Sequence, residues 1–94
     1  MLHIRFGENG EVHLTGRFDA SQVDKATEEF EKITASCTLN FAELEYISSA
    51  GLGVLLMTQR RLNDSGQSLK IVNLNKNIRD VFRYAGFDKV FEIA

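Results

Sequence analysis

The sequence predicts an α/β fold, formed as a single domain over residues 1–94. Three observations lead to this fold class. Apolar and polar residues alternate near the N-terminus, apolar residues recur every three or four positions in three later stretches, and short apolar runs separate those stretches. The predicted order of elements is ββαβαβαβ. Strands that alternate with helices indicate a mixed, mostly parallel sheet with helices packed against it.

The first two strands are predicted as a β-hairpin over residues 2–15. Apolar residues alternate with polar ones on both sides of Asn9 and Gly10. Asn-Gly is a strong turn signal, because both residues adopt positive φ angles at low cost. His3 and His13 fall on positions that alternate away from the apolar side. We therefore expect both histidines on the surface of the hairpin and not in a catalytic site.

A helix is predicted next, over residues 22–35. Ser21 is its expected N-cap, with Asp24 three positions later as an imperfect capping box. Its apolar stripe consists of Val23, Ala26, Phe30 and Ile33. A short alternating strand is predicted over residues 37–41. Cys37 is the only cysteine, so we expect no internal disulfide and a buried structural thiol.

The second predicted helix covers residues 50–64, where Leu52 and Leu55 share one face. Its first turn contains Gly51 and Gly53, and each glycine costs a helix about 1 kcal/mol relative to alanine. Such glycines indicate that something approaches the backbone closely.

The C-terminal part is predicted to form a strand, a helix and a short last strand. Residues 69–74 are a nearly continuous apolar run, which is typical of a central strand buried on both faces. Asn75 or Asn77 is the expected N-cap of the third helix, and Gly86 its C-cap. Residues 90–93 form the expected last strand.

Composition argues against several functional classes. The net charge is −2, from 11 basic and 13 acidic residues without a strong basic patch, so we expect no nucleic-acid partner. No apolar run approaches the roughly 18 residues that span a bilayer, and residues 1–16 lack the apolar region of a signal peptide. We expect a cytoplasmic protein without a membrane partner. Because no His, Cys or acidic residues have ligand spacing, we expect no metal and no cofactor.

The glycine-containing segment does not match an enzyme motif. Ser49, Ala50 and Gly51 complete only half of the Gly-x-Ser-x-Gly nucleophile motif, because Ile47 replaces the first glycine. The pair Gly51 and Gly53 lacks the remaining residues of a dinucleotide-binding or phosphate-binding loop. Since so small a domain also leaves little room for an enclosed cleft, we expect a binding protein and not an enzyme.

Ser48 and Ser49 have two interpretations. A serine before a helix is commonly its N-cap, whose oxygen accepts a hydrogen bond from a backbone N–H group. Alternatively, one of the hydroxyls accepts a phosphate, which the free N–H groups and the helix dipole would stabilise. A phosphate of about −1.5 to −2 charge would then repel an acidic or apolar partner docked there.

Three segments together resemble a known family. Residues 46–56 resemble the STAS domain of bacterial anti-sigma factor antagonists, whose motif Asp-Ser-Ser/Ala-Gly-Leu precedes a helix. Residues 16–20 are similar to the family's Gly-x-Leu/Phe-Asp segment. Residues 69–91 are similar to its strand, helix and closing Gly-Phe-x-x-x-Phe sequence. The resemblance covers nearly the whole chain in the correct order.

The resemblance implies a partner-switching function. In that family an anti-sigma factor serine kinase phosphorylates the antagonist, which binds the kinase only when unphosphorylated, and a PP2C-type phosphatase restores it. The matched phosphoacceptor is Ser49, with Asp19 as the acidic residue near it. The implied partner-binding residues are Asp19, Ser48, Ser49, Gly51, Leu52 and Gly53. Leu52 is either an apolar contact for the partner or a core residue.

Two positions depart from the family pattern. Ser48 stands where the family has an aspartate, which makes Ser48 a second candidate acceptor, and Asn40 replaces an aspartate in the preceding strand. Two alternative functions remain: a constitutive STAS subunit of a larger assembly, such as a lipid-transport ATPase, and a binder of a small molecule or nucleotide. We expect a monomer, because no long exposed apolar edge is evident.

Overall fold

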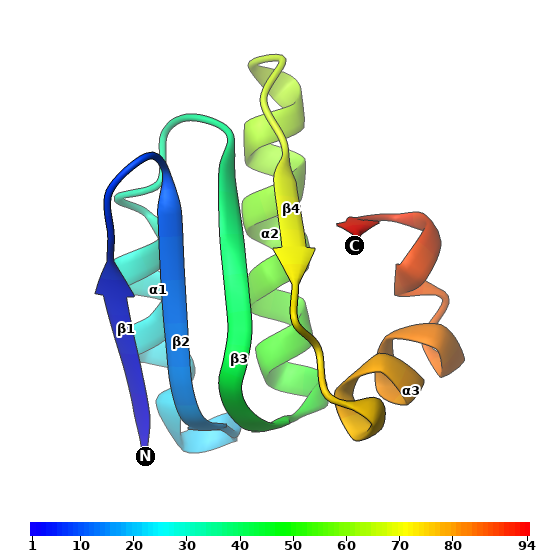
Figure 1. The fold of residues 1–94 in the computed structure, drawn as a ribbon. Helices are drawn as coiled ribbons and strands as arrows, with labels where there is room; N and C mark the ends of the chain where they lie inside the picture. Colours follow the sequence, from blue (N-terminus) through cyan, green and yellow to red (C-terminus); the bar gives the residue numbers. More distant parts are fainter.

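The computed structural model describes all residues 1–94 and contains one five-stranded sheet (Figure 1). The strands follow the order of the chain: β1 (Leu2–Phe6), β2 (Glu11–Phe18), β3 (Cys37–Ile47), β4 (Leu69–Val72) and β5 (Glu92–Ile93). β1 is antiparallel to β2, and every later pair of neighbours is parallel. The predicted fold class and the order ββαβαβαβ are therefore confirmed.

Three helices and two 3₁₀ turns complete the fold: η1 (Ala20–Gln22), α1 (Val23–Phe30), α2 (Ser49–Asp64), α3 (Lys76–Tyr84) and η2 (Phe87–Lys89). Both α1 and α2 lie behind the sheet in Figure 1, whereas α3 lies beyond β4 at the edge. A cluster of 21 buried apolar residues fills the space between the sheet and the helices. The domain is thus two layers thick, with one face of the sheet open.

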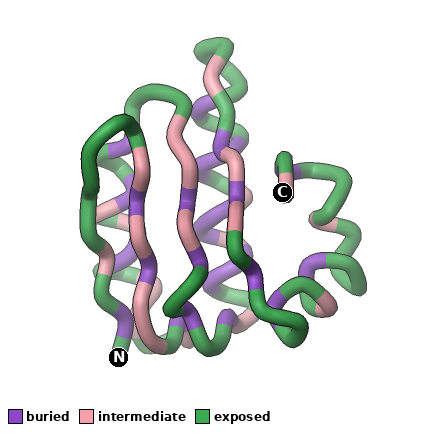
Figure 2. Tube along the Cα trace, viewed as in Figure 1, coloured by how far each residue is buried: buried purple, intermediate pink, exposed green.

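The open face corrects the prediction that the strand after residue 68 is buried on both sides. Along β4, Leu69 and Ile71 are buried, but Lys70 and Val72 are only half-buried. Figure 2 shows the same alternation of buried and half-buried residues along β2 and β4. The apolar run is nearly continuous because the apolar Val72 lies on the open face between the buried Ile71 and Leu74.

The N-terminal hairpin confirms its turn signal. Asn9 and Gly10 both have positive φ angles, of 59° and 73°. His3 is exposed, and His13 is half-buried in an ion pair with Glu11. Side chains alternate across a strand, so both histidines lie on the face opposite to the core.

The first helix begins differently from the prediction. Asp19, and not Ser21, supplies the side-chain cap, because its Oδ1 accepts a hydrogen bond from the Ser21 backbone N–H at 3.0 Å. This cap starts η1, and α1 follows with Gln22 at its N-cap position and no side-chain cap.

The same helix is also shorter than the predicted range of 22–35, since α1 ends at Phe30. Ile33 is buried, as its periodicity indicated, but lies in the loop after the helix. The Arg61 guanidinium, from α2, donates to the carbonyl oxygens of Phe30 at 2.9 Å and Ile33 at 2.8 Å. The Phe30 carbonyl also accepts from the Ile33 N–H at 3.0 Å, so this distant arginine adds a second donor there and gives the Ile33 carbonyl its partner just past the helix end.

β3 continues to Ile47, beyond the predicted strand of residues 37–41. The prediction stopped early because two irregularities in the pairing with β2 interrupt the alternation of apolar and polar residues. Asn40 pairs with His13 and Glu43 with Thr15, so β3 gains one residue relative to β2. The Asn40 Oδ1 accepts from the Ala42 N–H at 2.9 Å and from Asn73 Nδ2 at 3.1 Å. Asn40 thereby stabilises the first irregularity, a β-bulge, and links it to the end of β4.

The C-terminal elements confirm two signals and shorten two strands. Asn75, and not Asn77, caps α3 by accepting from the Ile78 N–H at 2.8 Å, and Gly86 follows with a φ of 76°. β4 stops at Val72 because Asn73 has a φ of 61°. The last strand contains only residues 92–93, since the N–H groups of Val90 and Phe91 still bond to the carbonyl of Phe87 in η2.

Cys37 is half-buried rather than fully buried. Desolvation raises the pKa of its thiol to about 11. The thiol is therefore protonated at neutral pH, which agrees with the expected structural role.

Candidate functional site

The candidate site lies where β2 and β3 end at the same edge of the sheet, the lower edge in Figure 1. Phe18 and Ile47 are register partners, and the backbone N–H of Ser48 donates to the Phe18 carbonyl at 2.9 Å. Asp19 and Ser48 follow these paired residues directly, and η1 contacts α2. The two sequence motifs, 30 positions apart in the chain, therefore meet at the carboxyl edge, where α/β folds commonly build binding sites.

Ser48 is the N-cap of α2. It has extended backbone angles, and its Oγ accepts a hydrogen bond from the Gly51 N–H at 3.1 Å. The residue is half-buried. A hydroxyl caps a helix about as well as the aspartate that the related motif carries, so the helix start tolerates this replacement.

Ser49 is the first residue of α2 and differs from Ser48 in both exposure and bonding. It is exposed, and its hydroxyl makes no hydrogen bond to the protein. The backbone N–H groups of Ser49 and Ala50 also have no acceptor in the protein. A free hydroxyl next to two free N–H groups at the positive end of a helix suits the addition of an anion.

The two serines should differ in their effect on stability. Ser48→Ala is expected to lower the free energy of unfolding by about 1 kcal/mol, because it leaves the Gly51 N–H without its cap. Ser49→Ala is the matched control and should change that free energy by less than about 0.5 kcal/mol. Urea denaturation of both variants measures the difference. Equal effects at the two positions would contradict the assignment of the cap.

Gly51 and Leu52, two of the six expected partner-binding residues, face inward. A Cβ on Gly51 would lie 2.9 Å from Ile47 Cγ1 and 3.1 Å from the ring of Phe18. This glycine therefore allows α2 to pack closely onto the sheet, and the close approach comes from inside the protein. Leu52 is only 5% exposed and belongs to the core. Gly53 is different, because a Cβ there would have no neighbour within 4 Å.

Asp19 is half-exposed at this edge, and its contacts are local. The Ser21 hydroxyl and backbone N–H both donate to its carboxylate. The hydrogen bond from the Ser21 hydroxyl is the main cause that lowers the pKa of Asp19, against a smaller opposing effect of desolvation. This stabilisation is present above the pKa of an unfolded aspartate and is lost as the pH falls through the lower pKa of Asp19. No hydrogen bond joins Asp19 to Ser48 or Ser49.

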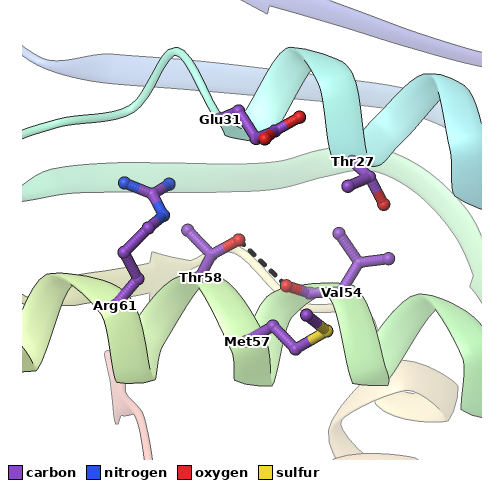
Figure 3. A pocket seen from close by; sticks show the side chains of 6 residues that line it. All are labelled: Thr27, Glu31, Val54, Met57, Thr58 and Arg61. Atoms are coloured by element: carbon purple, nitrogen blue, oxygen red, sulfur yellow. Dashed lines mark hydrogen bonds between the residues drawn. The ribbon is translucent and has the colours of Figure 1, made fainter.

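A groove between α1 and α2 was not anticipated from the sequence (Figure 3). It has a volume of about 230 Å³ and is lined by Thr27, Glu31, Val54, Met57, Thr58 and Arg61. Met57 is 70% exposed, although it continues the apolar run of α2. The one signal in the sequence that could have revealed the groove is Met57, a large apolar residue outside the apolar stripe of its helix.

The structure contains neither a metal site nor a membrane-spanning helix. No three His, Cys, Asp or Glu side chains gather closely enough to bind a metal ion. None of the helices has both the length and the apolar character needed to cross a membrane.

Comparison with known proteins gives a family and a set of relatives. Residues 4–93 match the family model described as "Mlab, STAS domain". A protein of Bordetella bronchiseptica, BtrV, is named as a candidate anti-sigma factor antagonist and is 35% identical over 75 residues, or 80% of this chain. The chain spans 59% of the length of that relative.

Two solved structures share the fold. An anti-sigma factor antagonist from Mycobacterium paratuberculosis has a TM-score of 0.82 and 18% identity, over 99% of this chain and 83% of its own. The Bacillus cell fate determinant SpoIIAA, in its phosphorylated form, has a TM-score of 0.71 and 20% identity, over 100% of this chain and 91% of its own. At such low identity these likenesses establish the architecture alone.

Proposed function

This chain belongs to the STAS domain family, and on that premise we propose that it is an anti-sigma factor antagonist controlled by phosphorylation of Ser49. Its partner is an anti-sigma factor serine kinase, which it binds when unphosphorylated. The observation that carries the proposal is the exposed, unbonded hydroxyl of Ser49 at the N-terminus of α2. The name of the Bordetella relative supports the same function.

The surface for the partner is formed by four residues at the carboxyl edge: Asp19, Ser48, Ser49 and Gly53. Gly53 contributes backbone that a partner can approach, since a Cβ there would point into open space. The backbone of Gly51 and the buried side chain of Leu52 support this surface from inside.

Phosphorylation would act on binding and leave the fold intact. A phosphate on Ser49 adds about −1.5 to −2 charges in the middle of the docking surface. The free N–H groups of Ser49 and Ala50 can donate hydrogen bonds to it, so the helix tolerates the charge. A partner packed against this surface would have to desolvate the phosphate and would therefore dissociate. A PP2C-type phosphatase reverses the switch by removing it.

Ser49 is the preferred acceptor over Ser48. Phosphorylation of Ser48 would modify the oxygen that accepts the hydrogen bond from the Gly51 N–H, on a half-buried side chain. The Ser49 hydroxyl needs no bond to be broken before a kinase reaches it. The difference follows from their positions, with one serine before the helix and the other inside its first turn.

The test is phosphorylation of the purified protein by the anti-sigma factor kinase of the same cell, followed by fragmentation mass spectrometry. We expect one phosphate, on Ser49, and none on Ser49→Ala. Ser49→Asp should bind the kinase at least tenfold more weakly, whereas Ser49→Ala should bind it permanently. Ser68→Asp is the matched control, an exposed serine just before β4, and should bind normally. A phosphate confined to another residue, or none at all, would refute the proposal.

A second candidate function is a constitutive subunit of a larger assembly, such as a lipid-transport ATPase. The observation that favours it is the matching family model, whose description names Mlab and does not name an antagonist. The same variants separate the two functions. A constitutive subunit keeps its partner with either Ser49→Ala or Ser49→Asp and carries no phosphate in native cells.

A further inference from the structure

The groove between α1 and α2 is lined by the apolar side chains of Val54 and Met57, by two threonines, and by the charged residues Glu31 and Arg61 (Figure 3). The hydroxyls of its two threonines are engaged by their own helices, since Thr27 donates to the Val23 carbonyl at 2.8 Å and Thr58 to the Val54 carbonyl at 2.9 Å. Neither threonine can therefore donate to a ligand, although its oxygen can still accept a hydrogen bond. Met57 contributes a flexible thioether chain that is 70% exposed, a side chain suited to adaptable apolar contacts.

The groove lies further along the same side of α2 as the proposed docking surface around Ser49. Ser49, Gly53 and Met57 are spaced by four residues and so lie on one face of α2. Eight residues of helix separate Ser49 from Met57 along the axis by about 12 Å. A typical protein interface buries about 800 Å² on each partner, a patch with a radius of about 16 Å. A partner of that size centred on Ser49 reaches the groove.

The α1 side of the groove carries unpaired negative charge. Glu28 and Glu31 are exposed, lie three residues apart at the end of α1, and take part in no ion pair. The nearby Lys32 pairs with Glu29 instead. The Arg61 guanidinium is held by the carbonyls of Phe30 and Ile33 and forms no ion pair with these carboxylates.

From these observations we propose that the groove receives an apolar side chain of the partner protein, next to a basic residue that meets Glu28 and Glu31. The proposal rests on the proposed function and adds a docking contact that phosphorylation does not touch. The distance of about 12 Å from Ser49 along α2 exceeds the Debye length of about 8 Å at physiological salt. The groove therefore contributes affinity and partner choice, and Ser49 contributes the switch.

Two charge-changing variants test the groove, each with a matched control. Met57→Arg places a bulky cation at the groove, and Tyr84→Arg makes the same change at an 82% exposed aromatic residue on α3. Glu31→Lys reverses one carboxylate, and Glu8→Lys makes the same change at an exposed residue of the hairpin turn that does not line the groove. Met57 and Glu31 are exposed, so the fold should survive, which thermal unfolding verifies.

The measured quantities are the Kd for the anti-sigma factor kinase and the kinetics of Ser49 phosphorylation. Met57→Arg should raise Kd and KM about tenfold with kcat unchanged, because it removes binding without touching the reacting hydroxyl. Glu31→Lys should raise Kd at least threefold. Both controls should stay within twofold of the unmodified protein.

The outcomes distinguish this proposal from the one on which it rests. If both groove variants bind normally while Ser49→Asp still releases the kinase, the groove proposal is wrong and the proposed function stands. If the unmodified protein neither binds the kinase nor is phosphorylated, both proposals fail. NMR titration of ¹⁵N-labelled protein with the kinase gives a second measurement. Amide shifts at Thr27, Glu31 and Thr58 support the groove, and shifts confined to the α2 N-terminus overturn it.

Discussion

Phe82→Ala is expected to lower the free energy of unfolding by about 4 kcal/mol, the largest effect of any substitution considered. Phe82 is fully buried on α3. Its ring lies edge-on against three others, with centroid distances of 6.2 Å to Phe41, 6.4 Å to Phe87 and 5.8 Å to Phe91. Alanine removes the apolar burial and the aromatic contacts and leaves a cavity between β3, α3 and η2.

Tyr84→Ala is the matched control for this prediction. Tyr84 is an aromatic residue two positions later on the same helix, but it is 82% exposed. Its replacement should change the free energy of unfolding by no more than about 0.5 kcal/mol. Equilibrium urea denaturation followed by circular dichroism measures both. A loss below about 2 kcal/mol for Phe82→Ala would show that α3 contributes little to the core.

Gln59→Met is expected to cost about 3 kcal/mol, because it leaves two main-chain groups without partners. Gln59 is 4% exposed on α2. Its Oε1 accepts from the Leu69 N–H at 2.8 Å, and its Nε2 donates to the Val90 carbonyl at 3.0 Å. One side chain therefore joins the start of β4 to the segment before β5. Methionine preserves length and most of the volume, so the lost hydrogen bonds dominate the effect.

Gln67→Met is the matched control for Gln59→Met, because it removes a glutamine whose hydrogen bonds are exposed and not buried. The Gln67 Oε1 also accepts two hydrogen bonds, from the Ser36 N–H at 3.0 Å and the Ser36 hydroxyl at 2.8 Å, but in exposed surroundings. Water replaces those bonds, and the expected loss is about 1 kcal/mol or less. Denaturation of the two variants under the same conditions gives the comparison. Equal losses would mean that water reaches the Gln59 contacts.

The contacts that hold α2 in place support the proposal that a phosphate on Ser49 would change binding and not the fold. The helix is held at three points: Gly51 packs against the sheet, Gln59 bonds to the β4 side, and Arg61 bonds to the end of α1. Together they leave α2 little freedom to move when its N-terminal charge changes. A modification at Ser49 then acts through the surface that it alters.

Short-range patterns predicted the elements and two of their ends. The Asn9-Gly10 turn needs only two residues that accept positive φ, and both do so in the structure. Asn75 marks the start of the third helix through its side chain, and Gly86 marks its end through its positive φ angle. The motif around Ser49 identified the helix start at which Ser48 serves as the cap. All of these signals depend on neighbours along the chain, and they predicted the fold class and the family.

The tertiary structure decided the features that depend on residues far apart in the chain. α1 stops at Phe30, whose carbonyl accepts from both the Ile33 N–H and the Arg61 guanidinium, and β3 extends past its first bulge because Asn40 bonds across it. The inward role of Gly51 follows from the position of Phe18, 33 residues earlier in the sequence. A periodic pattern shows which side of an element is apolar. Only the packed structure determines which distant side chain bonds to the backbone of that element, and which side chains pack against its apolar side.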